Sequence, residues 1–196
     1  VINDSAIEGW MKCTSAGGGW GDGLGKADYT VYFYAAFSKP LKDYGVWSAG
    51  IPDNWNRKRE DVESARYQDR IAHAAILKDI KEKEGKHLGF YTDFATAANE
   101  KVMLKAGISF VSTDNAKENL QAEIPAWDFD KVHQTARTLW NTAISKISVE
   151  GGTGDQKKVF YTALYHTMID PRSMEDVNGE YPGGGDKVHT GKSFTK

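Results

Sequence analysis

The stretch VEGGTGDQKKVFYTALYHTMIDPRSMEDVNGEYPGGG, residues 149–185, decides how the rest of the chain is interpreted. Its opening GGTG turn can adopt positive φ angles without a steric penalty. Either Thr153 or Asp155 can then cap a following helix, and an acidic residue also suits the positive end of the helix dipole. The pattern predicts a helix over residues 156–169, which Pro171 ends.

Apolar side chains lie on nearly every side of this predicted helix. One face carries Val159, Phe160, Ala163, Leu164 and Met168, and another carries Tyr161, Tyr165 and Ile169. A helix of this kind is typical of the buried part of a large all-α body. Such a helix needs partners, and the pattern indicates only one other long helix to supply them. We therefore expect the 196 residues to be a piece of a larger polypeptide.

Two motifs in this region resemble a known family. They are FYTALYHTMIDPR, residues 160–172, and DVNGEYPGG, residues 176–184, and they are similar to glycoside hydrolase family 92, the calcium-dependent exo-acting α-mannosidases. The resemblance extends back through KAGISFVSTDNAKENLQAEIPAWDFDKVHQTARTLWN, residues 105–141, and more loosely to VYFYAAFSKPL, residues 31–41. The close match thus covers about the last half of the chain.

The resemblance implies an N-terminal β-sandwich, a C-terminal six-hairpin α/α barrel, and an active site between them. It implies hydrolysis with inversion, in which a carboxylic acid protonates the leaving oxygen and a carboxylate roughly 6.5–9.5 Å away activates water. It also implies calcium, a hard cation that prefers oxygen ligands, bound to mannose hydroxyls. The catalytic residues and calcium ligands are expected downstream of Lys196, so this chain alone should be inactive.

Three residues are candidates for contact with a mannose-containing glycan. Asp176 and Tyr181 lie in the polar loop predicted over residues 170–185, where a barrel would open. Asp176 could accept hydrogen bonds from sugar hydroxyls or cap the turn that follows it. His166 could face a pocket or be a hydrogen-bonded core histidine. No residue of the chain is nominated as a metal ligand or as a catalytic group.

Residues 1–112 predict a portion of an antiparallel β-sandwich, the incomplete N-terminal domain. Alternating or apolar runs predict its strands, whereas residues 71–80 suit either a strand or a short helix. The predicted strands lie at residues 29–37, 41–48, 88–94 and 102–112. The Gly-rich residues 7–26 predict a strand and an irregular turn that could present Trp20 to a sugar. The charged residues 51–64 predict a solvated loop or an insertion.

Residues 113–150 predict two linker helices. Residues 114–123 form the first, capped by Ser112, Thr113 or Asp114, and residues 127–147 form the second, capped by Asp128. Strands followed by helices predict two domains rather than one mixed sheet. The expected fold class is therefore a multi-domain β plus α protein, with the start of the α/α barrel over residues 151–196.

Composition narrows the partners. A formal net charge of −2 disfavours a nucleic acid, since phosphate binding needs a basic face. No apolar run is long enough to cross a membrane, and the single cysteine, Cys13, allows neither an internal disulfide nor a zinc site. The family resemblance implies a periplasmic or extracellular protein.

Two other functions remain open. One is a carbohydrate-binding β-sandwich without hydrolysis, suggested by Trp10 and Trp20 in the Gly-rich start. The other is a different inverting glycosidase or a phosphorylase built on the same sandwich-and-barrel plan.

Overall fold

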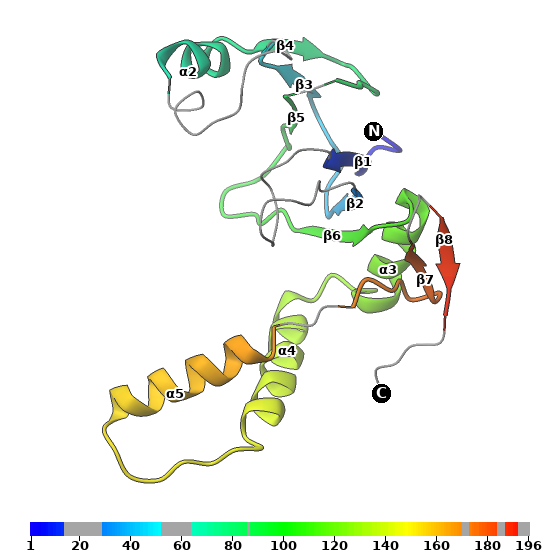
Figure 1. Ribbon diagram of the computed structural model, residues 1–196. Helices are drawn as coiled ribbons and strands as arrows, with labels where there is room; N and C mark the ends of the chain where they lie inside the picture. Colours follow the sequence, from blue (N-terminus) through cyan, green and yellow to red (C-terminus); the bar gives the residue numbers. More distant parts are fainter. Residues whose placement is uncertain (14–28, 52–63, 86, 170–172, 184–186, 192–196) are drawn as a thin grey trace. The chain divides into compact units, whose positions relative to one another are not determined.

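The computed structural model describes residues 1–13, 29–51, 64–85, 87–169, 173–183 and 187–191 (Figure 1). Trp20, Pro171 and almost all of the charged segment predicted as a loop therefore lie outside the described residues. The chain divides into two compact units. The first comprises Val1–Gly9 and Tyr34–Ala106, and the second comprises Trp10–Phe33 and Gly107–Lys196.

One three-stranded sheet has the order β1–β2–β6. Strand β1 spans Ala6–Cys13, β2 spans Tyr29–Phe37 and β6 spans Leu104–Ser109. The central strand β2 has the bounds that its alternating, β-branched and aromatic sequence predicts. Its residues Tyr34 and Ala35 are buried, as expected for the middle strand of a sheet.

A second sheet has the order β4–β3–β5, and both pairs are antiparallel. Strand β3 spans Tyr44–Ser48, β4 spans Ala75–Lys78 and β5 spans Leu88–Thr92. Trp47 of β3 lies opposite Gly89 of β5. A Cβ at Gly89 would lie 2.1 Å from the Trp47 indole, so only glycine leaves room for that ring.

The segment that suits either a strand or a helix contributes to both. Helix α2 spans Ala65–Ala72 with Ser64 as its N-cap, and after the short link that follows, the chain enters strand β4. Before residue 113 the described residues thus form six strands and one short helix.

The three helices predicted after residue 112 are confirmed. Helix α3 spans Thr113–Glu123, α4 spans Phe129–Ile144 and α5 spans Gly154–Thr167. Their N-caps are Ser112, Asp128 and Thr153, each of which accepts a hydrogen bond from a main-chain N–H in the first turn. At Thr153 the cap is a full capping box, because the Gln156 side-chain oxygen in turn accepts a hydrogen bond from the Thr153 N–H.

Helix α5 has no buried residue in this chain, although its apolar sides predict a helix of the buried part of a larger all-α body. Among the described elements its packing partner is α4, to which a loop connects it (Figure 1). Trp140 of α4 contacts Tyr165 of α5 with ring centroids 4.6 Å apart. No residue of either helix is buried, and Val159 is 71% exposed. A single neighbouring helix covers one side of α5 and leaves its other apolar sides open.

The prediction that residues 170–185 form a loop is partly wrong. Strand β7, Glu180–Pro182, pairs antiparallel with β8, Val188–Thr190. We call these two paired strands the hairpin. In the part of the chain that the structure describes, no helix combines the length and the apolarity needed to cross a bilayer.

Candidate functional site

The predicted site residue Asp176 is a buried carboxylate at the entrance to the hairpin, 7% exposed. Three side chains donate hydrogen bonds to it. The Ser109 hydroxyl lies 2.6 Å from Oδ2, the Asn115 amide 2.8 Å from Oδ2, and the Asn119 amide 2.7 Å from Oδ1. All four residues belong to the second unit.

The sequence around residue 110 explains how these donors converge. Asn115 and Asn119 are four residues apart on α3, so their side chains share one helix face. Ser109 is the last residue of β6, and its oxygen also accepts the N–H groups of Val111 and Ser112. The corner between β6 and α3 therefore presents three donors to one point.

The two asparagines bind more of the hairpin than Asp176. Asn115 also donates to the Glu180 carboxylate at 2.8 Å, so that one amide bridges two carboxylates. Asn119 accepts the Val177 N–H at 2.9 Å and donates to the Ile108 carbonyl. We call Ser109, Asn115, Asn119, Asp176 and Glu180 the polar network. Among the described residues, no buried side-chain nitrogen or oxygen lacks a hydrogen-bond partner.

The turn after Asp176 is closed by main-chain groups. The Asp176 carbonyl accepts the Gly179 N–H at 2.8 Å, and the Asp176 N–H donates to the Glu180 carbonyl. Gly179 has a φ of 86°, in the left-handed region that favours glycine. The side chain of Asp176 thus accepts hydrogen bonds from α3 and β6, whereas its main-chain groups close the turn.

Tyr181 lies on β7 and is 37% exposed. Its ring stacks on that of His189, its partner across the hairpin, with centroids 5.6 Å apart and 23° between the planes. Sequence reasoning missed His189, because its place opposite Tyr181 depends on a strand pairing that no periodicity indicates.

His166 lies on α5 and is exposed, with its ring 5.7 Å from that of Tyr165. The structure thus brings Asp176 and Tyr181 to one hairpin. Within the described ranges, no hydrogen bond or ring contact joins His166 to either of them.

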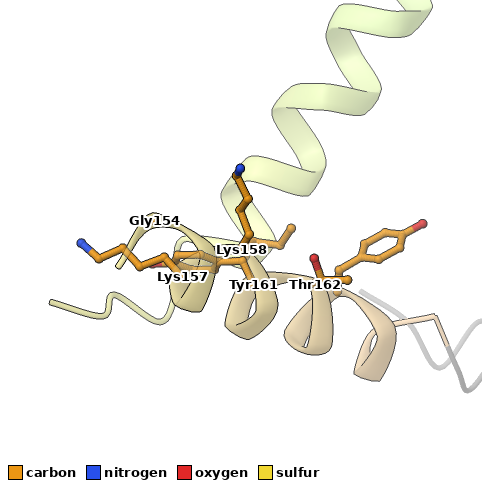
Figure 2. A pocket seen from close by; sticks show the side chains of 7 residues that line it. Gly154, Lys157, Lys158, Tyr161 and Thr162 are labelled. Carbon is orange, nitrogen blue, oxygen red and sulfur yellow. The ribbon is translucent and has the colours of Figure 1, made fainter. Parts of the chain in front are cut away.

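An open hollow of about 520 Å³ lies between the end of α4 and the start of α5 (Figure 2). Figure 2 shows Lys157 and Lys158 extending from the first turns of α5 in different directions. The residues that line the hollow are Ile144, Gly154, Lys157, Lys158, Tyr161, Thr162 and Tyr165. Without a carboxylate in this lining, the hollow holds no acid–base pair for hydrolysis.

The described residues do not fit a calcium site. No group of three or more His, Cys, Asp or Glu side chains among them is arranged to hold a metal ion. The polar network contains two carboxylates, those of Asp176 and Glu180, and the Asn115 amide donates a hydrogen bond to each. Its N–H groups would face a bound cation unfavourably.

Comparison with known proteins places both parts of the chain in one family. The description "Glycosyl hydrolase family 92 N-terminal domain" matches residues 1–109, and "Glycosyl hydrolase family 92 catalytic domain" matches residues 115–196. A protein from Arthroderma benhamiae described as an uncharacterized secreted glycosidase is 36% identical over 100 residues. That match covers 48% of this chain and 13% of the relative.

Solved structures show the same fold. A family GH92 inverting mannosidase from Bacteroides thetaiotaomicron matches with a TM-score of 0.71 and 22% identity, over 96% of this chain and 22% of its own. A family GH92 α-mannosidase from the same organism matches with a TM-score of 0.64 and 23% identity, over 98% of this chain and 22% of its own. The chain thus spans about a fifth of the length of these structures.

Proposed function

This chain belongs to glycosyl hydrolase family 92, and we propose that it forms part of an α-mannosidase that releases terminal mannose from glycans. The observation that carries the proposal is that the family's N-terminal and catalytic domains match in succession along the chain. The mannosidases of the same fold support the choice of mannose. The activity belongs to the complete polypeptide.

The proposed reaction is hydrolysis with inversion at the anomeric carbon. It needs a carboxylic acid to protonate the leaving oxygen and a second carboxylate to take a proton from the attacking water. Asp176, the buried carboxylate of the described residues, has its oxygens bonded to amide and hydroxyl donors, so it suits neither role. We assign the acid, the base and the calcium ligands to polypeptide beyond these 196 residues.

Tyr181 and His166 are the proposed sugar contacts on this chain. Tyr181 keeps more than a third of its surface exposed on the hairpin, and an exposed aromatic ring can pack against the apolar face of a pyranose. His166 is exposed on α5 and offers a ring nitrogen to a sugar hydroxyl.

Helices α4 and α5 are proposed as the first hairpin of an α/α barrel. Their exposed apolar side chains support this, since a barrel would cover them with further helices of the same domain. The largest exposures are those of Phe129, Leu139 and Val159. The chain covers only 22% of the matched inverting mannosidase, so we propose that the complete polypeptide supplies these further helices. The secreted relative supports an extracellular location.

The test uses proton NMR to identify which anomer of mannose the complete polypeptide releases first from an α-mannoside. We expect β-mannose to form first, activity to fall on chelation of calcium, and no release by the 196-residue chain. α-Mannose as the first product would contradict inversion. Turnover that requires phosphate would indicate a phosphorylase.

A carbohydrate-binding module is the second candidate, because Trp10 is 52% exposed on β1. Titration calorimetry of the 196-residue chain with mannose distinguishes the two candidates. The enzyme predicts little binding by the chain alone, whereas the module predicts measurable binding without any hydrolysis by the complete polypeptide.

A further inference from the structure

We infer that Asp176 is a positioning residue, which fixes the hairpin to the corner between β6 and α3 and does not bind sugar. The hairpin carries Tyr181, the proposed sugar contact, so the functional side of this inference rests on the proposed function. The structural side rests on hydrogen bonds alone.

The first argument is occupancy. A carboxylate has about four lone-pair positions for hydrogen bonds, and Ser109, Asn115 and Asn119 take three of them. Asp176 is only 7% exposed, so little of its surface is left for a further partner. A sugar ligand would have to displace a bonded donor, and the displaced donor would then be left buried without a partner.

The second argument is the origin of the donors. Ser109 ends a strand of the sheet, and the two asparagines lie on α3, so Asp176 joins two elements to a third. The three donors precede Asp176 by 57 to 67 positions in the chain. A buried charge is tolerated only when it is well hydrogen-bonded, and here every donor comes from the one corner. Asp176 therefore specifies where the hairpin docks.

The third argument is the small size of the hairpin. Its strands β7 and β8 have three residues each, and an isolated two-stranded hairpin is at best marginally stable in water. Its attachment to α3 runs through the polar network, through the Val177 N–H on Asn119, and through a long contact from Asn178 to Glu118. The orientation of Tyr181 and His189 thus depends on the Asp176 carboxylate.

The test compares Asp176→Asn with the matched control Asp155→Asn in the 196-residue chain, by hydrogen exchange. Asp155 is an exposed carboxylate in the first turn of α5. The reporter amides are those of Gly179, Gly183 and Gly191, each bonded within the hairpin segment. In Asp176→Asn we expect exchange at these amides to rise about tenfold or more, because the new NH₂ group faces donors. Exchange in β3 should not change.

A milder variant guards against loss of the whole fold. Asn119→Ala removes the bond to Oδ1 and the acceptor for Val177 but leaves the Ser109 and Asn115 bonds. We expect a smaller rise in exchange at the same amides and a weaker Tyr181–His189 cross-peak in a nuclear Overhauser spectrum. Hairpin exchange equal to that of Asp155→Asn in both variants would overturn the inference.

The complete polypeptide separates this inference from the proposed function. If Asp176→Asn weakens mannose binding while hairpin exchange is unchanged, Asp176 is a sugar ligand, and the inference fails while the mannosidase stands. If the unsubstituted polypeptide releases no mannose, the proposed function fails, and the exchange result still decides the role of Asp176.

Discussion

Lys39 and Glu100, 61 residues apart in the chain, form an ion pair with 2.7 Å between Nζ and Oε1. Lys39 also donates to the Ala95 carbonyl, and the Ala97 N–H donates to the second oxygen of Glu100. The Lys39 hydrogen bond first, and then the Ala97 N–H, lower the pKa of the Glu100 carboxyl from its ordinary 4.5. The pair holds the segment after β5 to the end of β2.

The lowered pKa makes this link sensitive to acid. Since the pKa is lower in the folded state, its stabilisation is present above the unfolded pKa and is lost as the pH falls through the folded value. The urea concentration at the midpoint of unfolding should therefore decrease as the pH is lowered from 6 to 3. In Glu100→Gln it should fall less over the same range. An identical pH dependence in both proteins would show that Glu100 does not contribute to the loss of stability in acid.

The capping box at α5 should contribute measurably to stability. Thr153→Ala removes the side-chain acceptor for the Gln156 N–H, and loss of an N-cap typically costs about 1 kcal/mol. Circular dichroism during urea unfolding measures the change. Thr162→Ala, exposed in the middle of the same helix, is the control and should be neutral or slightly stabilising. Equal midpoints for the two variants would contradict the role of the cap.

The ring of Trp47 sets a strict limit on its partner across the sheet. Gly89→Ala places a methyl group where the indole lies, and overpacking of this kind costs about 1–3 kcal/mol. Gly154→Ala provides the contrast, because nothing lies within 4 Å of its Cβ position and alanine favours the first turn of α5. Unfolding midpoints should move in opposite directions. Loss of stability in both would show that the close contact is not the cause.

The exposed side of α5 predicts an effect that depends on context. Val159 is 71% exposed, so Val159→Lys should change the stability of the 196-residue chain by no more than about 0.5 kcal/mol. If further helices cover this side in the complete polypeptide, the same change buries an amine and should cost about 1–3 kcal/mol there. Thermal unfolding of both proteins tests the difference. A neutral result in the complete polypeptide would mean that this side stays open.

The parts of the fold that sequence predicted are those that local chemistry decides. Ser112, Asp128 and Thr153 are oxygen-bearing residues just before helical patterns, and each accepts its hydrogen bond from within the next three residues. Strand β2 was equally legible, because nine residues of alternating and aromatic sequence stand between polar breaks.

The candidate site was only partly predictable, because its bonds are long-range. Asp176 and Tyr181 could be picked out from their motif, but nothing in the motif indicates Ser109, Asn115 or Asn119 as the partners of the carboxylate. Three-residue strands are too short for a periodic signal, which is why the hairpin was mistaken for a loop. For α5 the pattern gave the apolar sides correctly, but burial also requires neighbours, and within the described residues only α4 is one.

The distance along the chain between α3 and Asp176 has a consequence for biosynthesis. Asn115 leaves the ribosome 61 residues before the carboxylate that its amide will bind. At a synthesis rate of roughly 5–20 residues per second, that interval lasts about 3–12 seconds. Throughout it, the corner between β6 and α3 is a nascent surface with its amides bonded to water. The corner is completed only when translation has delivered the hairpin.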